Sequence, residues 1–225
     1  MTDTAGDQPS ASAKTPSRAR LWTECLLLFG GVPALMLATV GMFPLFPVLA
    51  VLAVVAVVLL AATPGFAWRE LREGGLLRHW RILVLFTAVS VAAATVLTLW
   101  LRPEWFLAFP RYAPERWLLV MTFYPLVSAL PQELIFRTLF FRRYGVLFPG
   151  TNALIAANAA VFGVGHLFYQ NPVAIGLSAF AGAVIAWAYA RTGSFALAWA
   201  LHAIGGWSLF TIGLGRYFYH GAIPS

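Results

Sequence analysis

Long apolar runs, separated by short breaks rich in proline, glycine or arginine, occupy most of the chain after residue 20. A helix crosses the hydrocarbon core of a bilayer with about 20 mostly apolar residues, so runs of this length predict transmembrane helices. Seven runs qualify, at residues 21–42, 45–62, 82–101, 117–136, 152–171, 173–190 and 194–214. The pattern predicts an all-α polytopic membrane protein with about seven transmembrane helices and a buried polar cavity.

The segments outside these runs complete the predicted organisation. Residues 1–20 are polar, rich in Ser, Ala and Pro, and without periodicity, which predicts a disordered cytoplasmic tail. Residues 68–81 are amphipathic, so we expect them to lie on the membrane surface. The chain thus divides into the tail 1–20, the N-terminal transmembrane helices with the amphipathic loop (21–116), a helical core (117–214) and a C-terminal tail (215–225).

The composition supports a membrane protein and excludes most other classes. Hydrophobic residues make up 60% of the 225 residues and charged residues 10%, whereas a soluble domain carries about 25% charged residues. Such a chain lacks the polar surface to face water on all sides. Cys25 is the one cysteine, so neither an internal disulfide nor a cysteine metal cluster is possible.

The net charge of +7 marks topology rather than a nucleic-acid surface, because the basic residues stand in short clusters between apolar runs. With the N-terminus inside, eleven basic residues fall on the cytoplasmic side and four on the other side. Cytoplasmic loops carry the excess of Lys and Arg, so we expect the N-terminus in the cytoplasm and the protein in a bacterial inner membrane. We expect no nucleic-acid partner.

Glu133 is the single acidic residue after Glu115, and it stands inside an apolar run, in Pro131-Gln132-Glu133-Leu134-Ile135-Phe136-Arg137. Glu133 and Arg137 are four residues apart on one helical face, so they can form an ion pair. We expect Arg142 and Arg143 to mark the cytoplasmic interface. Glu133 precedes Arg143 by ten residues, or about 15 Å along a helix, which places it near the bilayer midplane. Charged groups at this depth are costly and usually functional. A buried ion pair that only fixes helix packing is the alternative.

Two histidines also lie in apolar runs. His202 follows Arg191 by eleven residues, again about 16 Å deep, whereas His166 lies close to the turn at Asn171-Pro172 and needs a tilted helix or a re-entrant turn to reach the same level. Asn158, Phe162 and His166 recur every four residues, so Asn158 is a candidate to orient the imidazole. The structural alternative is hydrogen bonding between helices.

A carboxylate and two imidazoles in a dry cavity are suited to hydrolysis. The carboxylate is a base for water, and the imidazoles can position the water, stabilise an oxyanion or bind a metal. We expect no obligatory cofactor. If a divalent metal takes part, Glu133, His166 and His202 are its candidate ligands.

These residues resemble the motifs of the CPBP family of intramembrane proteases, which includes type II CAAX prenyl endopeptidases and bacterial Abi proteins. The family motifs are Glu-Glu-x-x-x-Arg, Phe-x-x-x-His, and a His followed four residues later by Asn or a similar polar residue. The matching residues are Gln132-Glu133 with Arg137, Phe162 with His166, and His202 with Gly206, all within residues 117–214.

The resemblance implies a cavity open toward the cytosol, in which a glutamate activates water for peptide-bond cleavage and the histidines assist. Two positions depart from it, since Gln132 stands where the first glutamate is expected and Gly206 where the polar residue is expected. Gln132 cannot accept a proton near neutral pH. The base role therefore passes to Glu133, with Gln132 as a supporting group that holds water or the scissile carbonyl.

The sequence therefore predicts an intramembrane endopeptidase that cleaves a membrane-associated protein or peptide, with catalytic residues Glu133, His166 and His202. Supporting roles are predicted for Gln132, Arg137, Phe162 and Asn158. Two alternatives remain. A catalytically silent relative would bind membrane proteins as a scaffold or immunity factor, and a small transporter would use Glu133 and the histidines as a proton pathway. The oligomeric state stays open.

Overall fold

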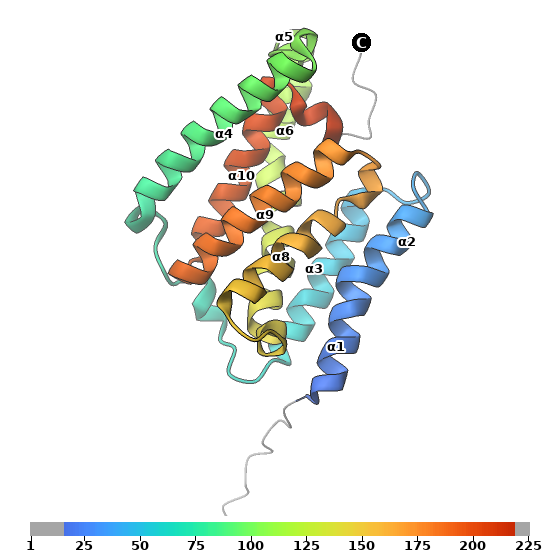
Figure 1. Cartoon of the computed structure of the whole chain (residues 1–225), viewed down its shortest axis with the longest axis vertical. Coiled ribbons are helices and arrows are strands. Elements are labelled where there is room, and N and C mark those ends of the chain that lie inside the picture. The colour runs from blue at the N-terminus through green and yellow to red at the C-terminus, as the bar shows by residue number, and fades with distance from the viewer. Residues whose placement is uncertain (1–15, 219–225) are drawn as a thin grey trace, which may run out of the picture.

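The computed structural model describes residues 16–218, and within this range every regular element is helical. Six helical stretches are long and apolar enough to cross a membrane: Arg18–Ala38, Leu76–Leu101, Pro114–Leu147, Thr151–Tyr169, Pro172–Thr192 and Phe195–Ile212. The shorter apolar helix Leu45–Ala61 is a further candidate crossing. The predicted polytopic helical membrane fold is confirmed (Figure 1).

The α-helices are separated in places by wider or tighter helical turns. They are α1 (Arg18–Leu26), α2 (Val32–Ala38), α3 (Leu45–Ala61), α4 (Trp80–Leu101), α5 (Ala108–Tyr112), α6 (Pro114–Tyr124), α7 (Leu130–Glu133), α8 (Thr151–Val164), α9 (Pro172–Thr192) and α10 (Phe195–Ile212). π-helical segments at Leu27–Gly31, Pro125–Ala129 and Leu134–Tyr144 join α1 to α2, join α6 to α7, and continue α7. Short 3-10 turns lie at Trp68–Arg72, Leu76–His79, Pro103–Trp105, Gly145–Leu147, Leu167–Tyr169 and Leu214–Phe218.

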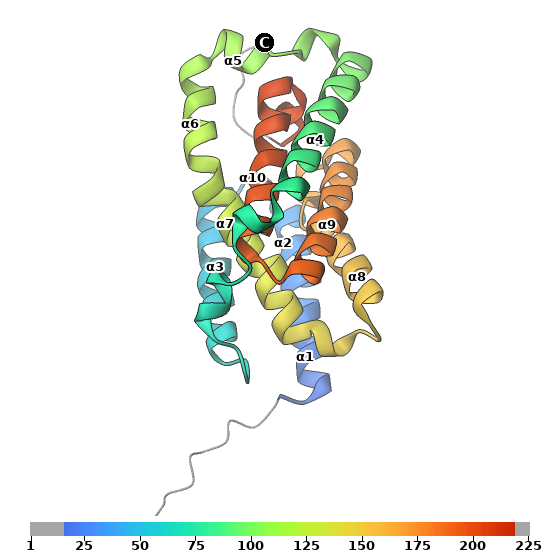
Figure 2. The same cartoon turned by 90° about the vertical axis from the view of Figure 1, so that its left-hand side faces the viewer.

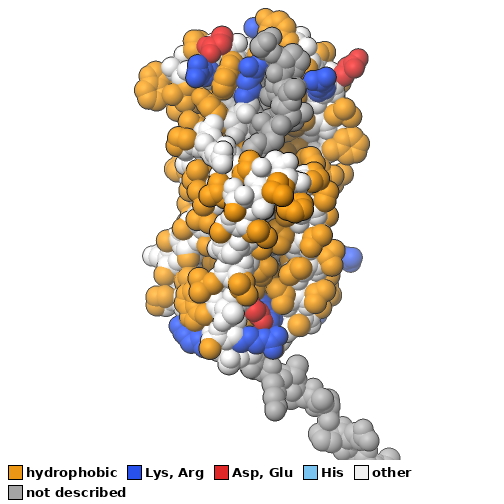
Figure 3. Space-filling view, turned by 90° about the vertical axis from the view of Figure 1, so that its right-hand side faces the viewer, with side chains coloured by type: hydrophobic (Ala, Val, Ile, Leu, Met, Phe, Trp, Pro, Cys, Tyr) orange, Lys and Arg blue, Asp and Glu red, His pale blue; other side chains and the backbone are white. Residues whose placement is uncertain are grey.

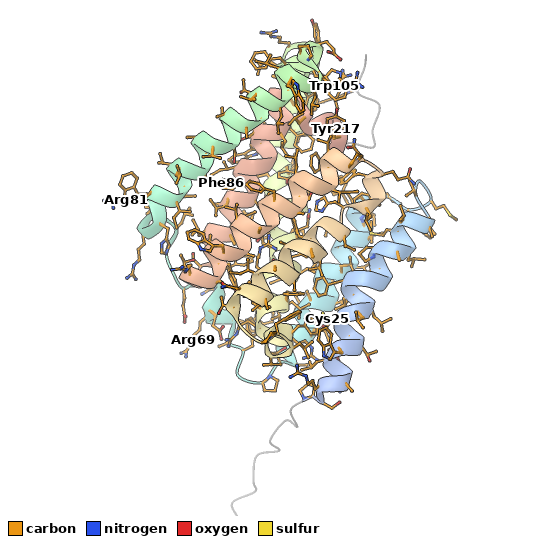
Figure 4. The ribbon with its side chains drawn as sticks, in the orientation of Figure 1. Cys25, Arg69, Arg81, Phe86, Trp105 and Tyr217 are labelled. Atoms are coloured by element: carbon orange, nitrogen blue, oxygen red, sulfur yellow. The ribbon has the colours of Figure 1, made fainter. Side chains whose placement is uncertain are left out.

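The last helix, α10, is the centre of the bundle. In its apolar stretch 56% of the residues are buried inside the protein, against 11% in the stretch that contains α4. Helices α4, α6 and α9 surround it (Figure 2), and Phe86 projects from α4 toward Gly205 of α10 (Figure 4). A residue on the inner faces of α10 is therefore well placed to meet the other helices away from lipid.

The surface has the polarity expected of a membrane protein. Hydrophobic side chains cover the middle of the molecule, whereas arginine side chains gather toward its two ends (Figure 3). At the end where α1 begins, Arg18 donates to the carbonyl of Leu147 (3.0 Å) and Arg142 pairs with Glu70 (3.0 Å). The start of α1, the turn at Trp68–Arg72 and the end of the helix Pro114–Leu147 therefore lie together at one end.

Small residues bring α8 and α9 close together. A side chain on Gly182 of α9 would crowd the ring of Phe162 on α8, with a Cβ only 3.0 Å from it, and one on Gly163 of α8 would crowd Ala179 to the same degree. Close approach at small residues is the usual means by which helices associate in lipid. The contact at Gly182 fixes Phe162, whose ring faces the interior of the bundle.

A proline interrupts the helix that leads to Glu133, and two tryptophans of α10 compensate for it. Pro125 has no amide hydrogen, so it cannot donate to the carbonyl of Met121 four residues earlier. The indole of Trp207 donates to that carbonyl (2.8 Å), and the indole of Trp199 donates to the carbonyl of Pro125 (2.7 Å). Unsatisfied carbonyls are costly in lipid, so these bonds fix α10 against the irregular segment.

Several predicted boundaries were wrong. The helix predicted at 117–136 extends to Leu147 because Arg143, taken as an interfacial residue, is buried in a hydrogen-bonded pair with Glu24 (2.7 Å). The helix predicted at 152–171 has its α-helical part only to Val164, after which the chain turns. The loop 102–116 contains α5. Residues 68–79 contain two 3-10 turns that lead into α4, and their expected position on the membrane surface stays a prediction.

The predicted tails lie mostly outside the described residues. Of the N-terminal tail, residues 1–15 are not described, and α1 already begins at Arg18, within the segment predicted to be disordered. Of the C-terminal tail, residues 219–225 are not described, and the preceding residues form the 3-10 turn Leu214–Phe218.

We predict that Trp207→Phe destabilises the protein by about 1–3 kcal/mol, because it leaves the Met121 carbonyl without its indole donor in an apolar setting. The measurement is the thermal or denaturant unfolding transition in detergent. Trp187→Phe, at an exposed tryptophan of α9, is the matched control and should leave the transition unchanged. Equal effects of the two substitutions would contradict the role of the bond.

Candidate active site

Glu133 and His202 meet in the interior of the bundle. Glu133 is the last residue of α7 and His202 lies midway along α10, and the carboxylate Oε1 is 2.7 Å from the imidazole Nδ1. Glu133 is fully buried and His202 is 7% exposed. The carboxylate accepts, so Nδ1 carries the proton and Nε2 is the ring nitrogen left to act as a base when the imidazole is neutral.

Arg137 provides the charge that opposes the buried carboxylate. Its Nε lies 3.3 Å from Glu133 Oε2, and both side chains are fully buried. Its Nη1 donates to Asn158 Oδ1 (2.7 Å), and the Asn158 amide nitrogen donates in turn to the carbonyl of Phe136. A buried ion pair is tolerated only when further hydrogen bonds satisfy it, and Asn158 of α8 supplies one of them.

His166 is positioned by the chain that precedes it. It follows the end of α8, and its Nδ1 lies 2.7 Å from the carbonyl oxygen of Phe162. A carbonyl oxygen only accepts, so Nδ1 again carries the proton and Nε2 is left as an acceptor. The ring stacks on Tyr169 (centroids 5.8 Å apart, 27° between planes).

Phe162 links the two histidines. Its ring centroid lies 4.8 Å from that of His166 and 5.5 Å from that of His202. The Arg137 guanidinium carbon lies 4.8 Å from the same ring, at cation–π distance. The aromatic residue of the second motif is therefore the shared wall against which the two imidazoles and the arginine are packed.

A cavity of about 430 Å³ opens beside these residues. Its walls are mostly apolar, and the polar groups that line it include Tyr124, Ser128, Gln132, His166, Tyr169 and His202. Glu133 is fully buried and reaches this cavity through His202. A smaller cavity of about 70 Å³ beside α2 and α3 shares Leu45, Gln132, His166 and Tyr169 with it, so these four residues stand between the two spaces.

The structure brings the three motif segments together. The Glu133–Arg137 pair predicted from their spacing is present, and His202 reaches Glu133 directly. The expected contact between Asn158 and His166 was wrong, because Asn158 bonds Arg137 and Phe136 instead. The described residues contain no group of three or more His, Cys, Asp or Glu side chains arranged to hold a metal ion.

Sequence reasoning missed Tyr124 and Ser128, which line the cavity with Gln132. The Gln132 amide donates to the Ser128 hydroxyl (2.9 Å). Tyr124, Ser128 and Gln132 recur every four residues and so share one helix face. This spacing of polar groups within an apolar run was the signal available in the sequence.

Residues 114–208 match the model of the family described as type II CAAX prenyl endopeptidase Rce1-like. The resemblance to the CAAX protease family is confirmed. The matched segment contains all three motifs, from Gln132 to Gly206. No curated protein and no solved structure matches the chain. The described helices indicate an integral membrane protein, and the family match over residues 114–208 supports an intramembrane protease kind of function.

We predict that Arg137→Met destabilises the protein by about 3–5 kcal/mol, because it leaves the Glu133 carboxylate buried without its cation. The unfolding transition in detergent measures this loss. Arg142→Met is the control, because Arg142 pairs with Glu70 at a partly exposed position, where a pair contributes about 0–1 kcal/mol. A similar, small effect of both substitutions would show that Arg137 does not compensate the carboxylate.

Proposed function

We propose that this protein is an intramembrane endopeptidase that hydrolyses a peptide bond of a membrane-associated protein or peptide. The observation that carries the proposal is the 2.7 Å contact between Glu133 Oε1 and His202 Nδ1 at the wall of an otherwise mostly apolar cavity. A buried carboxylate–imidazole pair at a cavity is an arrangement for general base chemistry. The family match supports peptide-bond hydrolysis as the reaction.

In the proposed reaction the glutamate activates water through His202. Glu133 holds the imidazole in the tautomer with Nδ1 protonated and stabilises the imidazolium that forms. His202 Nε2 takes a proton from water as the water oxygen attacks the scissile carbonyl. The same nitrogen then delivers the proton to the leaving amine as the C–N bond breaks. Glu133 thus acts on the water indirectly, by orienting His202 and stabilising its protonated form.

His166 and Gln132 contribute neutral polar groups. His166 has its Nδ1 held by the Phe162 carbonyl, so its Nε2 is available to accept a hydrogen bond from the attacking water. Gln132 donates to Ser128 and offers its side-chain oxygen to water or to a substrate amide. These two side chains therefore position the reactants, whereas the proton itself moves to and from His202.

The cavity and the charge distribution suggest the setting of the reaction. The mostly apolar lining favours a substrate segment that is itself apolar around the scissile bond. Arg18, Arg142 and the turn at Trp68–Arg72 lie at the end where α1 begins. The excess of basic residues at that end supports a cytoplasmic N-terminus in a bacterial inner membrane.

The test is a comparison of protein termini in membranes from cells that express the wild type, Glu133→Gln or no protein, with expression levels matched. We expect termini that depend on the wild type and that fall at least about 10²-fold with Glu133→Gln, because the amide no longer stabilises the imidazolium. Glu104→Gln, at an exposed glutamate, is the control and should keep them.

Two outcomes would contradict the proposal. If no terminus depends on the wild type, or if Glu133→Gln produces the same termini, the carboxylate does not serve proteolysis. A deletion phenotype that both forms complement would then identify a silent relative that binds membrane proteins.

A further inference from the structure

Gly206 lies four residues after His202 on α10, and therefore on the same face of the helix. A Cβ at this position would overlap the ring carbons Cε1 and Cζ and the hydroxyl oxygen of Tyr124. The space that a side chain at position 206 would fill is occupied by the phenol end of Tyr124. Glycine is therefore required here by the tyrosine.

Tyr124 presents its phenol group beside the proposed base. It is the last residue of α6 and lines the large cavity together with His202 and Gln132. Its ring meets His202 edge to face (centroids 6.0 Å apart, 69°) and Phe210 likewise (5.6 Å, 67°). The hydroxyl lies where a side chain at position 206 would point, beside the residue one helical turn after His202 on α10.

Packing alone does not account for this arrangement. Phenylalanine would make the same edge-to-face contacts without bringing a hydroxyl into a mostly apolar cavity, where a polar group is costly unless it is hydrogen-bonded. The glycine that admits the ring also weakens the interior of α10 relative to alanine. The Tyr124 hydroxyl and the glycine at position 206 are thus each unfavourable for stability. Together they place an O–H donor in the cavity that His202 lines.

We propose that the Tyr124 hydroxyl donates a hydrogen bond to the carbonyl oxygen of the scissile bond and stabilises the oxyanion that forms there; this role rests on the proposed proteolytic function. As the water oxygen bonds to the carbonyl carbon, the C=O π electrons move to the oxygen and the water proton moves to His202 Nε2. When the C–N bond breaks, the C=O bond re-forms and the amine takes that proton. The phenol keeps its own proton throughout.

The first test uses the purified chain in vesicles that carry membrane proteins from cells lacking it, with new termini quantified over time. We expect Tyr124→Phe to lower the initial rate by about 10²–10³-fold, the usual effect of removing one oxyanion donor. Tyr144→Phe removes another buried hydroxyl, in the hydrophobic core, and should leave the rate near that of the wild type. A wild-type rate for Tyr124→Phe, or equal losses in the two variants, would overturn the role.

A second test examines Gly206 and Tyr124 together. Gly206→Ala should lower the rate because its methyl group displaces the phenol, and it should add little further loss in the Tyr124→Ala background, where neither the ring nor the hydroxyl remains to be displaced. Losses that multiply would overturn the inference. The unfolding transition of each variant in detergent is the control that checks that the variant is folded. A wild type that releases no termini would overturn this role and the proteolytic function together, whereas an active Tyr124→Phe overturns this role alone.

Discussion

A carboxylate in the interior of an apolar helical bundle has to be compensated, and the fold around Glu133 is arranged to do this. Arg137 supplies the opposite charge and His202 donates the short hydrogen bond to Oε1. Asn158 then satisfies part of the guanidinium. These partners lie on α8, on α10 and on the segment after α7, so the electrostatic requirement of one side chain ties together the helices that carry the three motifs.

Irregular backbone is concentrated in the same part of the chain. The helix from Pro114 to Leu147 contains two interior prolines, Pro125 and Pro131, and two π-helical segments, one on each side of the short α7. Such segments often accompany functional sites, and lipid tolerates them only where the freed backbone groups find partners. Trp207 of α10 supplies the partner of the Met121 carbonyl, and Trp199, on the other side of His202, adds a donor to the Pro125 carbonyl. The bonds that repair the helix therefore also set the register at which His202 meets Glu133.

The apolar runs were enough to predict the helical membrane fold. The position of Glu133 deep in an apolar run, four residues before Arg137, was enough to predict the ion pair between them. The helix end at 136 was not predictable, because the sequence does not distinguish a buried arginine from an interfacial one, and only the contact of Arg143 with Glu24 shows that Arg143 is buried. The close approach of the Tyr124 ring to Gly206 brings together residues of two helices that are far apart in the sequence. Such a contact leaves no periodic signal in a single sequence.

The order of Glu133 and His202 along the chain has a consequence for biosynthesis. Glu133 and Arg137 lie in the helix Pro114–Leu147, which is synthesised before α10. Before α10 is in place, the Glu133 carboxylate has Arg137 as its partner but lacks the imidazole of His202. A ribosome-bound or truncated chain that lacks α10 is thus without the proposed proton acceptor. Under the proposed mechanism, chain order delays the assembly of the hydrolytic centre until α10 has joined the helices around Glu133.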